Sequence, residues 1–345
     1  MSRSQLPAVE VTFSCAWWHE NYGLAFGREY WLDPIRRTEQ DRSMERLLYE
    51  RFGDVGLGDP DPQPKPNISL CGHRFIPAVL GCEILYSVDQ APAAVTRPID
   101  LDEMSRLQIP DLDESAIVRE TLRQARLLAD RYGACAGEIN VGGPLNVASV
   151  MLGDAMFVAC GGFPEAAHHV LDLVARTIVR VYDHVSCRVE PAVHQPSHRR
   201  LLLGDCPVVM ISPEMYRDLV LPHDSWYRQR AEHFVLHHCG VMDRYLDGYK
   251  RLGPTPPDEV EVGWGSDVRA ARRAFPTSKL ALMLNVPDVV AMSPAEIDEV
   301  LATLVLGGAP WNLVRSIWVA DVGPELSDER VRFLRTYPER LAICA

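Results

Sequence analysis

The chain has 345 residues, of which 47% are hydrophobic and 24% are charged, and this balance is typical of a globular enzyme with a large core. Its formal net charge of −12 argues against a nucleic-acid partner, because an acidic surface repels a phosphate backbone. The first twelve residues lack a basic segment followed by a long apolar run, and no apolar stretch is long enough to cross a bilayer. We therefore expect no signal peptide and no membrane partner.

The nine cysteines are scattered along the chain, their number is odd, and no CxxC pair occurs. This pattern predicts reduced thiols in a cytoplasmic protein rather than a disulfide framework.

In the N-terminal part, Asp33 and Pro34 supply the cap and first position of a helix, which ends in the glycine-rich residues 51–58 (RFGDVGLG). Residues 59–66 (DPDPQPKP) predict a loop, because alternating prolines remove backbone donors.

From residue 114 onward the chain alternates between strands and helices. Helices are predicted at 114–132, 164–184, 214–221, 242–251 and 293–306. Strands are predicted at 136–141, 201–203, 208–211, 234–237, 259–262 and 280–284.

This alternation predicts a parallel sheet, and the number of units favours a closed (β/α)8 TIM barrel. We expect one domain over residues 1–345, in which 1–110 form an N-terminal extension that contributes to the barrel and pocket and 111–345 form its remainder. Catalytic groups should lie where strands end.

The segment 236–240 (LHHCG) lies at the end of an apolar strand and before a helix. Because side chains alternate along a strand, His237 and Cys239 project to the same side. An imidazole and a thiolate so placed suit a soft tetrahedral ion such as zinc. The alternative is a histidine and a cysteine that only pack in the core.

This segment resembles the HxCG motif of methylcobalamin:coenzyme M methyltransferases, in the uroporphyrinogen decarboxylase-like superfamily. Further segments resemble the same superfamily in order and spacing: 140–146 (NVGGPLN), 161–165 (GGFPE), 204–205 (GD), 211–216 (ISPEMY) and 293–297 (SPAEI). The resemblance implies a (β/α)8 barrel in which His237 and Cys239 hold a zinc ion that activates a thiol for methyl transfer.

Two features depart from the resemblance. No RQAGRY-type segment is present, so decarboxylation of uroporphyrinogen is not expected. The methyltransferases also place a third, cysteine ligand in a late turn, whereas residues 318–324 (WVADVGP) contain no cysteine. The third metal ligand therefore stays open.

Residues 16–23 (AWWHENYG) concentrate aromatic and polar groups and resemble corrinoid-dependent O-demethylase methyltransferases. Trp17, Trp18, His19 and Tyr22 are candidate substrate-binding residues that would wall a pocket for a flat methoxyaromatic. The alternative is that the tryptophans fill the core.

Several other polar residues fall at candidate positions. Asp205 follows an apolar strand and Glu138 lies on an inward-facing one, so both are candidate catalytic groups. Asp267 follows another strand and is a candidate substrate-binding residue, while Cys71 and His73 could supply missing ligands.

These features predict a metal-assisted methyltransferase that moves a methyl group between a small substrate and a corrinoid on a partner protein. The substrate would be a methoxyaromatic or a thiol, and zinc would be the Lewis acid. One alternative is a metal-free, decarboxylase-like lyase that uses Asp205 and arginines. Another is a non-catalytic binding protein on a degenerate barrel.

Overall fold

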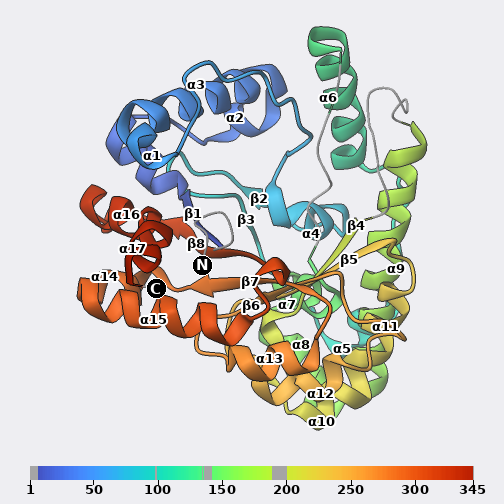
Figure 1. Ribbon diagram of the computed structural model, residues 1–345. Coiled ribbons are helices and arrows are strands. Elements are labelled where there is room, and N and C mark those ends of the chain that lie inside the picture. The colour runs from blue at the N-terminus through green and yellow to red at the C-terminus, as the bar shows by residue number, and fades with distance from the viewer. Residues whose placement is uncertain (1–6, 98, 134, 136–141, 189–199, 345) are drawn as a thin grey trace.

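A computed structural model describes residues 7–97, 99–133, 135, 142–188 and 200–344 (Figure 1). Its main sheet has six parallel strands in the spatial order β1-β8-β7-β6-β5-β4. These strands are β1 (Ala8–Phe13), β4 (Arg200–Gly204), β5 (His233–His238), β6 (Glu259–Val262), β7 (Lys279–Leu284) and β8 (Val314–Val322).

The strand order is that of a barrel rather than of an open sheet. From β4 to β8 each strand pairs with the next one along the chain, and β1 pairs in parallel with β8, where Val9 lies opposite Ile317. An open doubly wound sheet instead keeps its first strand inside the sheet. The strand predicted at 136–141 lies outside the described residues. A separate antiparallel pair is formed by β2 (Ile84–Leu85) and β3 (Ala93–Ala94).

The helices fall into a group before β4 and a group after it. The first group is α1 (Cys15–Tyr22), α2 (Arg28–Leu32), α3 (Pro34–Phe52), α4 (Phe75–Val79), α5 (Leu101–Arg106), α6 (Ala116–Tyr132), α7 (Pro144–Leu152), α8 (Asp154–Gly162) and α9 (Pro164–Arg188). The second group is α10 (Pro213–Met215), α11 (Leu221–Arg228), α12 (Leu246–Tyr249), α13 (Val268–Ala274), α14 (Val286–Ala291), α15 (Pro294–Gly308), α16 (Asp328–Arg335) and α17 (Tyr337–Cys344). Figure 1 shows α13 and α15 running along the outside of the sheet, while α1, α2 and α3 gather beside β1 and α16.

The predicted helix starts are confirmed where a cap could be recognised. The Asp33 carboxylate accepts hydrogen bonds from the N–H groups of Ile35 and Arg36 at the start of α3. Ser293 and Glu296 form a reciprocal capping box at the start of α15.

Two predicted elements differ in the structure. The strand predicted at 208–211 is a 3-10 helix, Cys206–Met210, with a proline in its first turn that has no N–H for a sheet ladder. The helix predicted at 214–221 continues to Arg228 and contains a π turn at Tyr216–Val220. Pro222 stands just after that turn and removes a helical donor, which is a known cause of such distortions.

The aromatic N-terminal segment packs into the core. Trp17 is 1% exposed and Trp18 is 3% exposed. The Trp17 ring lies 4.1 Å from that of Phe13, and the Arg51 guanidinium stacks 5.0 Å from the centre of the Trp17 ring. Arg51 also donates two hydrogen bonds of 2.7 Å to the Asp328 carboxylate. This cluster therefore joins α1 and α3 to α16, and the tryptophans fill the core.

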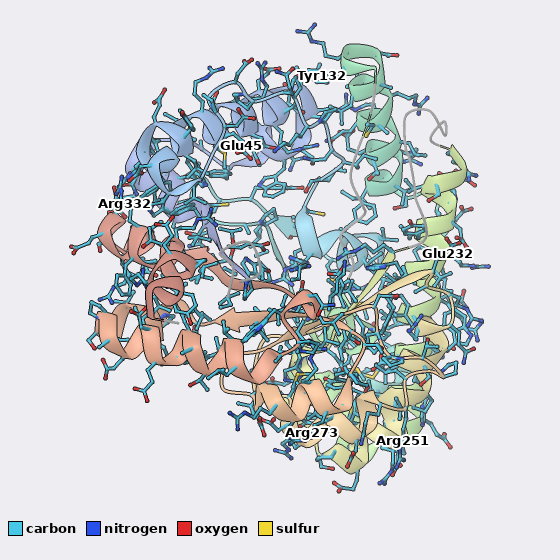
Figure 2. All side chains as sticks on the ribbon, in the orientation of Figure 1. Glu45, Tyr132, Glu232, Arg251, Arg273 and Arg332 are labelled. Carbon is cyan, nitrogen blue, oxygen red and sulfur yellow. The ribbon has the colours of Figure 1, made fainter. Side chains whose placement is uncertain are left out.

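Charged side chains lie around the outside of the molecule, as Glu45, Arg251, Arg273 and Arg332 show in Figure 2. Within the described residues no single helix is long and apolar enough to span a membrane. Only α7 and α8 together have the length and composition, and they meet at a bend of 115°.

Replacing Trp18 by alanine should leave a cavity in the core, because its ring is almost fully buried. We expect the free energy of unfolding to fall by about 3–5 kcal/mol, measured by urea denaturation. Tyr49→Ala, at a ring that is 43% exposed, is the control and should cost less than about 1 kcal/mol. Equal costs for the two variants would show that Trp18 is not a core residue.

Candidate active site

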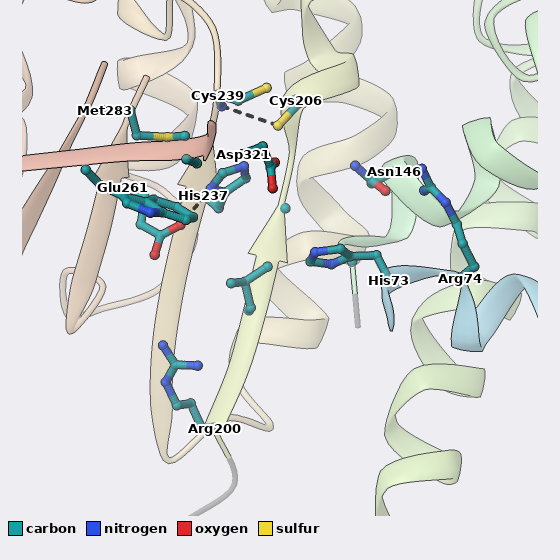
Figure 3. A pocket seen from close by; sticks show the side chains of 15 residues that line it. His73, Arg74, Asn146, Arg200, Cys206, His237, Cys239, Glu261, Met283 and Asp321 are labelled. Atoms are coloured by element: carbon teal, nitrogen blue, oxygen red, sulfur yellow. Dashed lines mark hydrogen bonds and ion pairs between the residues drawn. The ribbon is translucent and has the colours of Figure 1, made fainter. Parts of the chain in front are cut away.

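A cavity of about 560 Å³ extends along the inner side of the sheet to the carboxyl ends of its strands (Figure 3). Every second residue from β4 onward lines it: Arg200, Leu202, Gly204 and Cys206. The same alternation places His237 and Cys239 of the next strand, and Glu261 of the one after, in the cavity.

Cys206, His237 and Cys239 lie together in this cavity. Their two sulfur atoms and one imidazole nitrogen all lie within 4.8 Å of one another. The backbone N–H of Cys239 donates a hydrogen bond of 3.3 Å to the Cys206 sulfur. Pairing of Gly204 with His237 aligns the two strand ends and brings the three groups into reach.

These three donors fit a zinc ion. In a tetrahedral site with zinc–sulfur bonds of about 2.3 Å, two thiolates lie about 3.8 Å apart. Small side-chain rotations would therefore bring the three ligand atoms to bonding distance from one ion. Two thiolates and an imidazole are soft donors, and three protein ligands leave a fourth position open, as in catalytic zinc sites. Cys206 thus supplies the third donor that the late segment 318–324 lacks.

The protonation of the cluster favours a thiolate at Cys239. Hydrogen bonds from Cys206 and from His237 lower the pKa of Cys239 to about 4. The pKa of Cys206 is raised, first by its hydrogen bond with Cys239 and then by burial. Burial disfavours a charged His237, but its hydrogen bonds with Cys239 and Glu261 outweigh burial and raise its pKa to about 9.

Glu261 orients the His237 ring. The Nδ1 atom of His237 lies 2.6 Å from Oε2 of Glu261, and a carboxylate can only accept, so Nδ1 carries the proton. Nε2 is then the nitrogen that would bind an ion, in place of the proton that it shares with Cys239. Burial raises the pKa of Glu261, but His237, Arg315 and Arg200 together lower it, which keeps the carboxylate ionised. This is the carboxylate–histidine arrangement that supports metal-binding histidines.

A second histidine–glutamate pair occurs nearer the start of the same two strands. His233 contacts Glu259 at 3.0 Å, and Arg315 bridges to Glu259 at 2.7 Å. No thiol of the described chain joins this second pair in a metal-binding group. It therefore provides an internal comparison for the role of Glu261.

Asp205 lies on the opposite side of the strand from the cavity. It is fully buried and does not line the cavity, and burial raises its pKa well above the usual range. Behind the sheet it belongs to a buried polar cluster with His238 and Tyr249, whose hydroxyl lies 2.8 Å from Nδ1 of His238. The position predicted as catalytic is therefore a support behind Cys206 rather than a group in contact with substrate.

The same cluster contains a second buried acid, Asp224. The Tyr216 hydroxyl donates a hydrogen bond of 3.2 Å to it, and burial raises its pKa to about 8. Tyr216 and Tyr249 pack edge to face with their centroids 5.4 Å apart. Asp205 and Asp224 are thus held largely protonated between the sheet and its helices.

Of the remaining predicted site residues that the structure describes, His73 alone lines the cavity. Trp17, Trp18, His19 and Tyr22 are not among its lining residues. Asp267 is exposed and caps α13, where it accepts hydrogen bonds from two backbone N–H groups. Cys71 is buried elsewhere, whereas His73 does line the cavity. Glu138 lies outside the described residues.

Sequence reasoning missed several polar residues that the structure places in the cavity: Arg74, Asn146, Arg200, Cys206, Glu261 and Asp321. Cys206 could have been found from the sequence, because it continues the every-second-residue pattern of Leu202 and Gly204 and so should face the same side as they do. Asp321 lies in the segment where a late cysteine was expected, and it is the only non-glycine residue with positive φ, +54°, in the described chain. Such a conformation is unfavourable for an L-residue and is often found at functional sites.

A family profile and one similar solved structure agree with this architecture. A family profile described as uroporphyrinogen decarboxylase (URO-D) matches residues 68–310. A methyltransferase from Methanosarcina mazei has a similar structure, with a TM-score of 0.65 at 15% identity over 98% of this chain and 94% of that one. A B12-independent methionine synthase from Shewanella sp. W3-18-1 aligns over 98% of both chains at 11% identity, with a TM-score of 0.43. A search of curated proteins finds no match.

Replacing Glu261 by glutamine should weaken metal binding without unfolding the protein, because His237 would lose its charged acceptor. We expect the zinc dissociation constant to rise about 10–100-fold, measured by competition with a chromophoric chelator. Glu259→Gln removes the equivalent acceptor from His233 and should leave zinc affinity unchanged. An equal loss in both variants would refute the orienting role of Glu261.

Replacing Asp224 by asparagine should stabilise the protein increasingly as the pH rises. The folded pKa of about 8 exceeds the unfolded value of 3.8, so folding of the native chain holds a proton that is lost as pH rises toward 8. Between pH 5 and pH 8 the variant should gain about 1.4 kcal/mol per pH unit over the native chain. Urea denaturation at several pH values measures this, with the exposed Asp218→Asn as a control that should give a flat difference. A flat difference for Asp224→Asn as well would contradict the buried, protonated state.

Proposed function

The chain belongs to the uroporphyrinogen decarboxylase family, and we propose that it is a metal-assisted methyltransferase of that family. It would move a methyl group between a small substrate and a corrinoid carried by a partner protein. The observation that carries this proposal is the cluster of Cys206, His237 and Cys239 at a cavity wall. The resemblance of residues 236–240 to the HxCG motif of coenzyme M methyltransferases supports the same assignment.

Zinc at this cluster would act as a Lewis acid on the sulfur or oxygen of the substrate. The residues of the chain hold that position and leave one side of it open. Cys206 and Cys239 would supply thiolates from two neighbouring strand ends, and His237 would supply a neutral nitrogen fixed by Glu261. We assign acceptance of the substrate proton to the exposed carboxylate of Asp321, which lines the same cavity.

An apolar rim beside the cluster supports a macromolecular methyl donor or acceptor. Val209, Met210 and Val241 are exposed large hydrophobic residues, and they lie next to the segments that carry Cys206 and Cys239. Exposed apolar groups around a site commonly mark a contact surface. A corrin ring presented by a partner domain has both the apolar faces and the size to cover them.

The decarboxylase-like alternative depended on Asp205 as an acid–base group in contact with substrate. Burial of that carboxylate behind the strand removes the contact. The metal-assisted function is therefore the one that the described cavity supports best.

The proposal predicts one zinc ion per chain and methyl transfer that depends on it. We expect elemental analysis of protein purified without chelators to give about one zinc per chain, and Cys206→Ser and Cys239→Ser to lose it. Cys15→Ser, at a half-buried thiol outside the cluster, is the control and should keep the metal.

The activity itself is tested with free methylcobalamin and a panel of small thiols, by following demethylation of the corrinoid spectroscopically. Zinc-loaded protein should accelerate the reaction, and both serine variants should abolish the acceleration. A native protein that binds no zinc, or one that binds zinc and transfers no methyl group to or from any corrinoid, would overturn the proposal.

A further inference from the structure

The side of the cavity opposite Glu261 and Met283 carries a second set of polar groups. Figure 3 shows the side chains of Arg74 and Asn146 turned toward each other there, with His73 nearby. These groups come from segments far from the metal cluster in the chain. Arg74 ends a 3-10 turn before α4, and Asn146 lies in the first turn of α7.

Among the described residues, the guanidinium of Arg74 has no charged partner. Its guanidinium is half-buried at the cavity, yet it forms no hydrogen bond or ion pair with any residue that the structure describes. Other arginines with comparable exposure are paired, such as Arg51 with Asp328 and Arg340 with Asp298. A partly desolvated cation that faces a cavity, and that has no acid of the described chain beside it, can bind an anion.

Asn146 adds donors beside that cation. Its side-chain amide makes no hydrogen bond to another described residue, and its backbone begins a helix whose cap, Gly143, supplies no side-chain acceptor. The close approach of Gly143 to β4 fixes this helix end, since a Cβ at Gly143 would lie 2.6 Å from the Leu203 side chain. The N–H groups of the Asn146 amide and the positive end of the α7 dipole both favour a negatively charged ligand, as Arg74 does.

The acids of the cavity lie elsewhere. Glu261 is engaged by His237 and Arg315, and Asp321, which also lines the cavity, forms no ion pair with Arg74. Arg200 also lines the cavity, but it lies near Glu261 and helps to lower the pKa of that carboxyl, whereas Arg74 lies on the opposite side of the cavity from Glu261. A substrate with one charged end would bind in only one orientation.

We propose that Arg74 and Asn146 form an anion subsite, which binds an oxyanion group of the substrate while the reacting sulfur or oxygen faces Cys206, His237 and Cys239. The oxyanion is a carboxylate or a group of the same chemistry, such as a sulfonate, and the guanidinium binds two of its oxygen atoms side by side. Only the identity of the reacting end rests on the proposed function.

Binding of matched pairs of small molecules tests the subsite. The charged probes are 3-mercaptopropionate, 3-mercaptopropane-1-sulfonate and 4-methoxybenzoate, and their neutral counterparts are 3-mercaptopropan-1-ol and 4-methylanisole. Dissociation constants are measured by isothermal titration with zinc-loaded protein. We expect at least one charged probe to bind ten or more times more tightly than its neutral counterpart, and the probe that does so identifies the oxyanion and the reacting group.

Arg74→Gln should remove this preference while zinc content and affinity for the neutral probes stay unchanged. Arg46→Gln makes the same change of charge at an exposed position on α3 and should keep the preference. No preference in the native protein, or a preference that survives Arg74→Gln, would overturn the subsite. Because binding is measured without methyl transfer, an intact preference in a protein that transfers no methyl group would overturn only the proposed function.

Discussion

Side chains on parallel strands alternate between two faces, and this constraint determines which residues meet in the cavity. Residues of one parity on β4, β5 and β6 face inward and bring Cys206, His237 and Glu261 together. Residues of the other parity face the helices, where Asp205 and His238 join the buried tyrosines. The cluster of Cys206, His237 and Cys239 and the buried polar groups behind it thus lie on opposite faces of the same strand ends.

Much of the barrel was predictable, because its signals are local. Caps such as Asp33 and Ser293 mark helix starts, and short apolar runs between turn residues mark β5, β6 and β7. The pair of His237 and Cys239 followed from alternation within a single strand. The first and last strands, β1 and β8, were not predicted. They are stabilised by pairing with each other, and the two segments lie almost the whole length of the chain apart.

The errors at the site have a related cause. Asp205 was assigned to the mouth from its place after a strand, although its parity directs it to the other face. Glu261 and Arg74 became visible only when strands and turns that are distant in sequence were placed around one cavity. Trp17 and Trp18 have the composition of a pocket wall, and only their burial and the packing of Trp17 against Phe13 and Arg51 show that they fill the core.

The positions of Cys206, His237 and Cys239 in the chain allow the cluster to form before the sheet is complete. Cys206 and Cys239 follow the ends of two consecutive strands, so an ion at this cluster would brace only β4 against β5. Closure of the sheet instead joins the two ends of the chain through β1 and β8, with Arg335 donating a hydrogen bond of 2.6 Å to the carbonyl of Val9. During synthesis the donor atoms are complete soon after β5 leaves the ribosome, whereas closure must wait for the last strand. A metal centre built this way does not depend on β8 for a ligand, so the segment around Asp321 is free to change in sequence without dismantling it.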